Sequence, residues 1–452
     1  MLNLETDRGV RSCDGLTRRD FLRVGSVAVG LSLAELTELA RLGAAPGSSE
    51  KACIQLFLVG GPSQLDTWDP KPEAPDTVRG PFKPIRTNVP GIQICEHFPL
   101  MAERADRYAI LRSVYHKEAP IHETGHQLLQ TGRVDRDGIE WPHYGAVMNS
   151  LEPSRGGVPR WVMLPSPIGN TGVSISHGQD AGFLGEAHEP LIASAAMMPN
   201  GVSVASLSPD PACLDRCAGL VHSVDAAQTR VELAQGSAEF GESTEGAFAK
   251  IFSSRTKTAF DIEAESETTR ARYGTNTFGQ SCLLARRLIQ HGVRLVTVNM
   301  FDTVFNQVTW DCHANGNDLN TTLDDYKEIL CPMFDAAYTA LLDDLEGMGL
   351  LGNTLVVAMG EFGRTPKLNV HGGRDHWPGV WSILMAGGGV RGGQLIGESD
   401  KHAEEAKEQP IHAAEIVATV YHALGIDLNT RLQTPDGRLR PLVEAKPVAE
   451  LF

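Results

Sequence analysis

The chain has 452 residues, of which 40 are Lys or Arg and 56 are Asp or Glu, so its formal net charge is −16. With 42% apolar and 21% charged residues, the composition is typical of a globular protein and excludes a disordered or fibrous chain. The acidic balance argues against nucleic acid and anionic membranes as partners, because both require a surplus of Lys and Arg. An anionic substrate would therefore have to be captured locally, by metal ions or a few well-placed arginines.

The first 45 residues have the pattern of an export signal rather than of a folded domain. Arg18 and Arg19 precede an apolar stretch over residues 24–40, and small residues follow at 43–45. The paired arginines resemble the twin-arginine signal, which carries folded proteins across the bacterial inner membrane; the alternative is an amphipathic helix that happens to hold two arginines. We expect residues 1–45 to engage the twin-arginine export machinery and the protein to be exported in folded form, to the periplasm or another extracytoplasmic location. A permanent membrane span is not expected, because charges interrupt a stretch shorter than the roughly 20 apolar residues that a span needs.

Residues 46–452 alternate strand patterns with helical patterns. Short apolar runs predict strands at residues 52–59, 108–114, 294–299, 354–359 and 381–386. Helical patterns are found at residues 122–132, 278–290, 323–345 and 413–424. This alternation predicts an α/β fold with a doubly wound, mostly parallel sheet. Residues 150–255 are rich in Gly, Pro, Ser and Ala and show little periodicity, and we interpret them as a cap inserted over the core.

Carboxylates, histidines and arginines gather where the predicted strands end. The candidates are Asp66 after the first strand; Asp311 and His313 after strand 294–299; Glu361 and Arg364 after strand 354–359; Arg374, Asp375 and His376 before strand 381–386; and His122, Thr124 and His126 at the start of helix 122–132. Open α/β sheets bind ligands beyond the carboxyl ends of their strands. We therefore expect these side chains to meet at one edge of the sheet.

Clustered anions would repel one another, and bound divalent ions would relieve that cost. Mixed carboxylate and imidazole ligands suit zinc or manganese better than calcium. Two such ions could polarise an ester oxygen and activate water, while Arg364 and Arg374 hold the charged ester oxygens by paired N–H donors. Simpler interpretations stay open. Asp66 could be a turn residue, Glu361 a helix cap, and the two histidines of helix 122–132 could only stabilise a loop.

Four motifs resemble those of a known family. They are Gly-Gly-Pro-Ser-Gln-Leu-Asp-Thr-Trp-Asp-Pro-Lys-Pro (60–72), Trp-Asp-Cys-His-Ala-Asn (310–315), Met-Gly-Glu-Phe-Gly-Arg-Thr-Pro (359–366) and Gly-Gly-Arg-Asp-His-Trp-Pro (372–378). They resemble the uncharacterised bacterial family called domain of unknown function 1501, often described as sulfatase-like, from the export signal to near the C-terminus. That family is similar to the alkaline phosphatase and sulfatase superfamily, which implies a doubly wound core and a two-metal hydrolytic centre.

The resemblance implies roles for single residues. The implied metal ligands are Asp311, His313, Glu361 and His376, and Asp66 could substitute for a further one; Asp375, beside His376, is an additional metal candidate. There are also departures from the superfamily: His122 stands where sulfatases have the nucleophile, Thr124 is the nearest hydroxyl, and Phe362 replaces a ligand histidine. The formylglycine motif is missing as well. A histidine nucleophile, a metal-activated water and a partly dismantled site all stay open.

These observations lead to one expected function and one alternative. We expect an exported, metal-dependent hydrolase of sulfate or phosphate esters, acting on a small-molecule or polysaccharide substrate. His122, Thr124 or His126 would serve as nucleophile or acid–base partner. The alternative is a non-catalytic periplasmic binding or assembly protein on the same fold, with a structural metal.

Overall fold

The computed structural model describes residues 50–134, 138–151, 158–193, 195–198, 201–204 and 258–452. The predicted export signal at 1–45 lies outside these residues. Among the described residues, none of the helices is both long enough and apolar enough to cross a membrane.

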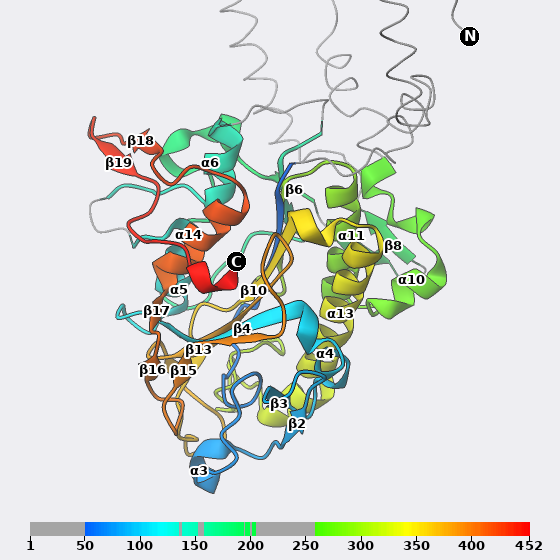
Figure 1. The fold of residues 1–452 in the computed structure, drawn as a ribbon, viewed down its shortest axis with the longest axis vertical. Coiled ribbons are helices and arrows are strands. Elements are labelled where there is room, and N and C mark those ends of the chain that lie inside the picture. Colours follow the sequence, from blue (N-terminus) through cyan, green and yellow to red (C-terminus); the bar gives the residue numbers. More distant parts are fainter. Residues whose placement is uncertain (1–49, 135–137, 152–157, 194, 199–200, 205–257) are drawn as a thin grey trace, which may run out of the picture. The chain divides into compact units, whose positions relative to one another are not determined.

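A nine-stranded sheet forms the centre of the described part of the chain (Figure 1). Its order is β14-β4-β13-β10-β1-β9-β5-β6, and β17 also pairs with β4. The strands are β1 (Ala52–Phe57), β4 (Tyr108–Tyr115), β5 (Trp161–Leu164), β6 (Leu191–Ile192), β9 (Leu295–Asn299), β10 (Thr354–Met359), β13 (Trp381–Ala386), β14 (Gln394–Ile396) and β17 (Ile411–His412). Within this sheet only β13 runs antiparallel to its neighbours, β10 and β4. The prediction of a mostly parallel sheet is confirmed.

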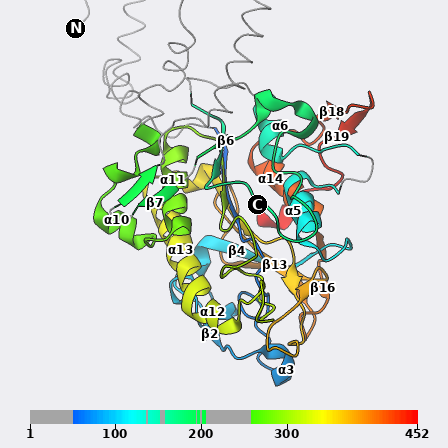
Figure 2. The ribbon, with the colours of Figure 1, turned by 180° about the vertical axis from the view of Figure 1, so that it is seen from behind.

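Helices cover both faces of the sheet (Figures 1 and 2). One face carries α11 (Thr277–Gln290) and α13 (Cys331–Gly347), and the other carries α5 (His122–Thr131), α6 (Tyr144–Leu151) and α14 (Ala413–Ala423). Side chains alternate along β1, so that Ile54 and Leu56 join one hydrophobic cluster while Cys53 and Phe57 join the other. A strand buried on both faces reads as a continuous apolar run, which is why the sequence predicted it. The doubly wound arrangement is thereby confirmed.

The helix predicted at 323–345 forms with an irregular first part. α12 (Leu323–Asp325) is followed by a π-helical turn (Tyr326–Leu330) and then by α13. Thr322 and Asp325 form a capping box, in which the Thr322 backbone N–H donates to Asp325 Oδ2 at 2.7 Å. Pro332 has no N–H for the α-helical bond at this point, and a wider turn just before it is consistent with that break.

The segment expected to form a cap, 150–255, contributes to the central sheet. Its strand β5 pairs in parallel with both β9 and β6. The apolar run of β5 has only four residues and stands among Gly, Pro and Ser residues, so its pattern was too short to stand out. Residues 152–157, 194, 199–200 and 205–255 of the expected cap lie outside the described residues.

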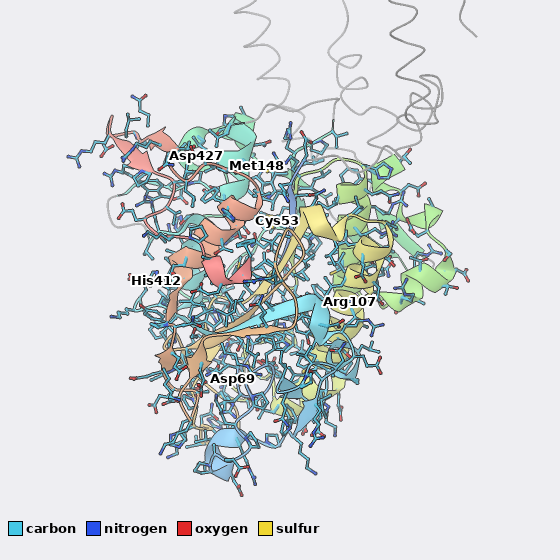
Figure 3. All side chains as sticks on the ribbon, in the orientation of Figure 1. Cys53, Asp69, Arg107, Met148, His412 and Asp427 are labelled. Carbon is cyan, nitrogen blue, oxygen red and sulfur yellow. The ribbon has the colours of Figure 1, made fainter. Side chains whose placement is uncertain are left out.

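The remaining strands and α-helices of the described residues are short. They are α3 (Asp76–Arg79), β2 (Pro84–Arg86), β3 (Gln93–Cys95), α4 (Pro99–Ala102), β7 (Ala195–Met198), β8 (Gly201–Val204), α10 (Glu267–Arg272), β11 (Gly363–Arg364), β12 (His376–Trp377), β15 (Glu398–Ser399), β16 (Ala406–Glu408), β18 (Arg431–Gln433) and β19 (Leu439–Pro441). Figure 3 shows the side chains that fill the layers around the sheet, with Cys53 labelled on β1. The described cysteines are free and buried, where a thiol behaves as a small apolar side chain.

Candidate metal centre

The parallel strands β1, β9 and β10 end at the same edge of the sheet, and the chain turns sharply there. Gly60 follows β1 with φ +104°, and a Cβ at this position would lie 2.5 Å from the backbone N of Asp311. Only glycine combines that backbone angle with such a close approach. The turn after β1 therefore brings the loop that carries Asp311 against the exit of the sheet.

Helix α5 contacts Glu361, the second residue after β10. The Glu361 Oε1 atom accepts a hydrogen bond from the Gly60 N–H at 2.8 Å, and it lies 2.6 Å from His122 Nδ1 and 3.3 Å from His126 Nε2. The two histidines are four residues apart, so they share one face of α5, as the sequence predicted. A Cβ on Gly125 would lie 2.6 Å from the Glu361 carbonyl oxygen, so the helix packs this closely only because residue 125 is glycine.

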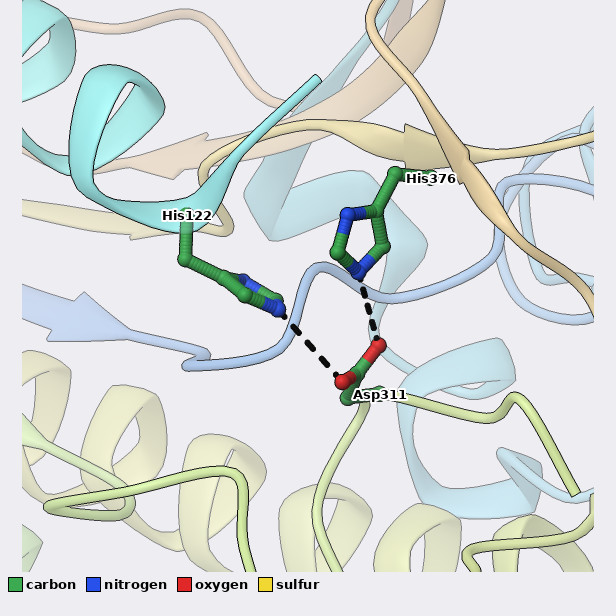
Figure 4. A group of neighbouring side chains, drawn as sticks. All are labelled: His122, Asp311 and His376. Carbon is green, nitrogen blue, oxygen red and sulfur yellow. Dashed lines mark hydrogen bonds and ion pairs between the residues drawn. The ribbon is translucent and has the colours of Figure 1, made fainter. Parts of the chain in front are cut away.

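Asp311 gathers a second group of side chains (Figure 4). Its Oδ1 atom lies 3.1 Å from Nε2 of both His313 and His376, and it also pairs with the guanidinium of Arg364. Its Oδ2 atom lies 3.4 Å from His122 Nε2. Figure 4 shows His122 and His376 directed at the two oxygens of this one carboxylate.

Three of the four histidines in the cluster have their outer ring nitrogen fixed. The Nδ1 atoms pair with Ser176 Oγ at 2.6 Å for His126, with Asp375 Oδ1 at 2.9 Å for His313, and with the Pro120 carbonyl at 2.8 Å for His376. Such outer partners fix the orientation of an imidazole and the tautomer it adopts. Each of the three rings therefore directs Nε2 towards the carboxylates of the cluster.

Several buried polar atoms of the cluster have no hydrogen-bond partner. They are His122 Nε2, His126 Nε2, Asp311 Oδ2 and Glu361 Oε2. Buried polar groups are nearly always satisfied, so their gathering at one place requires an explanation. Ligand atoms converge within 4.8 Å in two overlapping groups: His122, Asp311 and His376, and His122, His126 and Glu361. Imidazole nitrogens and carboxylate oxygens are the donors that zinc and manganese bind, so these residues fit a metal site.

The electrostatics of the cluster prepare most of its members to act as ligands. Burial acts to raise the pKa of Glu361, but His126 and His122 hold it well below its ordinary value. Burial also acts to raise the pKa of Asp311, but Arg364 and His122 keep it low. Burial, with help from Arg364, lowers the pKa of His376 to about 4. At neutral pH both carboxylates are therefore ionised and His376 is neutral.

His122 differs in its charge. Burial acts to lower its pKa, but the carboxylates of Asp311 and Glu361 on either side raise the pKa to about 9. In the metal-free protein this imidazole is therefore protonated at neutral pH. The protonated His122 ring thus places a positive charge between the carboxylates of Asp311 and Glu361.

The two arginines expected to bind an anion have partners inside the protein. Arg364 donates to the carbonyl oxygens of Gly61, at 3.0 Å, and of Gly60, as well as to Asp311. Arg374 donates through Nε to Asp66 Oδ2 at 2.6 Å. The anion-binding role of both arginines stays a prediction, and the geometry gives each of them a structural role.

The Asp66 carboxylate bonds to Ser63 and Arg374 rather than to the histidines of the cluster. Both Asp66 and Arg374 are fully buried, and Asp66 Oδ2 also accepts a hydrogen bond from Ser63 Oγ at 2.5 Å. Asp66 belongs to neither of the converging groups found among the described residues. Its role as a metal ligand stays a prediction, and the ion pair with Arg374 accounts for its burial.

The structure thus brings together six of the expected site residues: His122, His126, Asp311, His313, Glu361 and His376. Thr124 is half-buried and lies between His122 and His126 in α5. Asp375, whose side chain is 55% exposed, lies behind His313 as its hydrogen-bond partner. Burial acts to raise the pKa of Asp375, but hydrogen bonds from Asn369 and His313 lower it, so this carboxylate is ionised.

Two residues that support the site were missed in the sequence. Ser176 contacts His126, and Glu123 accepts backbone N–H bonds from Val173 at 2.8 Å and Ser174 at 3.1 Å. Together they attach the loop around Val173 and Ser176 to α5. The loop lies in the segment without periodicity, and the only signal was that Glu123 stands between the candidate residues of helix 122–132.

Fold and site together define an α/β protein of the doubly wound class, with a cluster of imidazoles and carboxylates at the edge where its parallel strands end. The chain belongs to the family described as "Protein of unknown function (DUF1501)", whose profile matches residues 50–452. The family resemblance seen in the four motifs is thereby confirmed. No curated protein matches the sequence.

Several solved structures are similar to the chain. The PsFucS1 sulfatase from Pseudoalteromonas sp. is 13% identical, with a TM-score of 0.36, over 86% of this chain and 70% of that one. The phosphonate monoester hydrolase SpPMH from Silicibacter pomeroyi is 11% identical, with a TM-score of 0.34, over 89% of this chain and 76% of that one. A mutant of the alkaline phosphatase PafA is 12% identical, with a TM-score of 0.37, over 90% of this chain and 100% of that one. Because these TM-scores are low, the function proposed below rests on the chain's own residues.

Proposed function

We propose that this protein is a metal-dependent hydrolase of sulfate or phosphate esters. The observation that supports the proposal is the convergence of five imidazole and carboxylate side chains at the strand-exit edge, with His313 beside Asp311 as a sixth. Four buried nitrogen and oxygen atoms of this cluster have no hydrogen-bond partner. The motifs that resemble the alkaline phosphatase and sulfatase superfamily indicate the class of ester. The substrate would be a small molecule or a polysaccharide that carries such an ester.

The residues that would hold metal fall into two sets. Asp311 and His376 face one side of His122, while Glu361 and His126 face the other. A bound zinc or manganese ion would supply Lewis-acid polarisation of the ester oxygen and would lower the pKa of water. The ionised carboxylates and the neutral His376 are already in the protonation states that such binding requires.

The chain's own residues also indicate the side from which an ester would approach. The side chains of His313 and His376 are 16% and 19% exposed, whereas those of His122, Asp311 and Glu361 are buried. Substrate would therefore meet the cluster at the two more exposed histidines. In this proposal His313 would accept or donate a proton at Nε2. The nucleophile roles considered for His122 and Thr124 stay predictions.

Metal content and ester turnover test the proposal together. Protein purified without chelator should contain divalent metal and hydrolyse members of a panel of sulfate and phosphate esters. Asp311→Ala should lose metal and turnover. Asp318→Ala is the matched control, because Asp318 is exposed on the same loop and should leave both unchanged. Turnover by Asp311→Ala at the wild-type rate would contradict the proposal.

One observation favours a non-catalytic binding or assembly protein. Arg364 directs its N–H groups at Gly60, Gly61, Asp311, His313 and the Arg374 carbonyl. It therefore has no N–H left over in this arrangement for a substrate anion. Stoichiometric metal that depends on Asp311, without turnover of any ester in the panel, would support this alternative.

We also propose that the protein is exported in folded form to the periplasm. The support is the sequence of residues 1–45, with its paired arginines before an apolar stretch. Fusion of this segment to a folded reporter should direct the reporter to the periplasm. Changing Arg18 and Arg19 to Lys should block export, whereas changing Arg8 and Arg11 to Lys should not. Export of the reporter with both Arg18 and Arg19 replaced would overturn the proposal.

A further inference from the structure

His122 is bonded differently from the other histidines of the cluster. His126, His313 and His376 each have Nδ1 fixed by a partner outside the converging groups and direct only Nε2 at the carboxylates. The His122 ring instead lies between two carboxylates. Its Nδ1 atom is 2.6 Å from Glu361 Oε1, and its Nε2 atom is 3.4 Å from Asp311 Oδ2.

The two converging groups share this one residue. Asp311 and His376 lie with His122 in one group, and His126 and Glu361 lie with it in the other. Each group keeps a carboxylate oxygen without a hydrogen bond, Asp311 Oδ2 in the first and Glu361 Oε2 in the second. The donor atoms are thus arranged as two separate sets on the two sides of a single imidazole.

The His122 ring is held in place by packing. Its centroid lies 5.0 Å from that of Phe362 and 4.4 Å from that of His376, and its side chain is only 4% exposed. The ring of Phe362 therefore packs against that of His122. Burial of this kind leaves little freedom for the imidazole to turn either nitrogen towards a substrate.

We propose that His122 is a bridging ligand between two metal ions. Its Nδ1 atom binds the ion held with Glu361 and His126, and its Nε2 atom binds the ion held with Asp311 and His376. An imidazole that binds through both nitrogens does so as the imidazolate, so the ring proton passes to solvent when the second ion is bound. This inference rests on the metal site of the proposed function but not on ester hydrolysis.

Copper(II) is the probe that tests the bridge, because two copper ions joined by an imidazolate couple their electron spins. Full-length protein is stripped with chelator, loaded with copper(II) and measured for copper content and by electron paramagnetic resonance. Wild-type protein should bind two ions per chain and lose most of the signal of isolated copper(II). His122→Ala should restore that signal in proportion to the copper it still binds.

Control variants separate the bridge from loss of a site and from surface binding. Glu361→Gln and Asp311→Asn each weaken one set of donors, so each should leave one ion with an isolated signal. His371→Ala removes an exposed histidine and should behave like wild type. These variants also keep the test valid if His122→Ala does not fold.

Three results would overturn the bridge: one ion per chain, two ions with uncoupled spins, or unchanged coupling in His122→Ala. Coupled copper in a protein that hydrolyses no ester would leave the bridge standing while the hydrolase proposal fails. Ester turnover by protein that holds a single ion would support the hydrolase proposal and contradict the bridge.

Discussion

Arg374 and Asp66 are a fully buried ion pair whose members approach from positions 308 residues apart in the chain. Removing one member of such a pair leaves an uncompensated buried charge. We expect Arg374→Ala to lower the free energy of unfolding by about 3–5 kcal/mol, measured by denaturant titration. Arg79→Ala is the control, because Arg79 pairs with Asp76 at an exposed site and should change stability by less than about 1 kcal/mol.

A different result would return Arg374 to the role first expected from its motif. If Arg374→Ala unfolds like wild type but raises KM for an ester, Arg374 binds the anion. The sequence could not decide between these roles. Arg374 and Asp66 both stand in glycine-containing motifs near strand ends, as ligands do, and only the folded chain shows that they bond to each other.

Ser176 is a positioning residue for His126. Its hydroxyl lies 2.6 Å from His126 Nδ1 and is buried. Loss of such an outer partner typically weakens metal binding by about 10–100-fold. We expect Ser176→Ala to show a loss of that size in competition titrations with a chelator, and Ser176→Thr to restore most of the affinity.

The neighbouring serine supplies the control for this variant. Ser174 is exposed, and its hydroxyl contacts only the adjacent Ile175 carbonyl, at 3.4 Å. Ser174→Ala should therefore bind metal like wild type. Equal affinities in Ser176→Ala and Ser174→Ala would show that the Ser176 hydroxyl does not orient His126.

Helix α5 packs closely against Glu361, so the geometry of the site depends on the position of this helix. A Cβ on Gly125 would lie 2.6 Å from the Glu361 carbonyl oxygen and 2.8 Å from Glu361 Cβ, and backbone cannot yield as a flexible side chain can. Gly125→Ala should push the helix away from the exit of β10 and weaken metal binding together with stability. Overpacking of this kind typically costs about 1–3 kcal/mol, which thermal and denaturant unfolding would measure.

Gly347, at the end of α13, is the matched control. A Cβ there would meet nothing within 4 Å, and alanine is favoured over glycine in a helix by up to about 1 kcal/mol. Gly347→Ala should be neutral or slightly stabilising. If Gly125→Ala matches it in metal affinity and stability, the close approach of α5 to Glu361 does not matter for the site.

The elements that position the site were largely predictable because their patterns are local. The buried strand β10 was predicted with the bounds it has, Thr354–Met359. β5 was missed because a run of four apolar residues carries little periodicity. The contact between Ser176 and His126 depends on how a loop returns across α5, and no local pattern encodes such a return.

For the whole molecule, the site exists only when distant segments come together. His122 and His376 lie 254 residues apart in sequence (376 − 122 = 254), yet both reach Asp311. Such a set of donors is lost on unfolding, so bound metal should stabilise the folded chain. Without metal, the same side chains should instead make stability depend on pH.

The signs follow from the pKa shifts. The pKa of His122 is raised from 6.5 to about 9, so its contribution to stability is fully present below pH 6.5 and is lost as the pH rises through about 9. Burial lowers the pKa of His376 and of His116 to about 4. Their contributions are present above pH 6.5 and are lost as the pH falls through about 4. Asp311 and Glu361, whose pKa values are low, lose theirs at more acidic pH.

Metal-free protein should therefore be most stable near pH 6.5, with a loss on both sides. Urea unfolding in the presence of chelator, from pH 4 to pH 10, would measure both limbs. His122→Ala should flatten the alkaline limb and keep the acid limb, because the imidazole that loses its proton towards pH 9 is gone while His116 and His376 remain. Stability that keeps rising from pH 6.5 to pH 9 in the wild-type protein would mean that His122 is not held between ionised carboxylates in the folded chain.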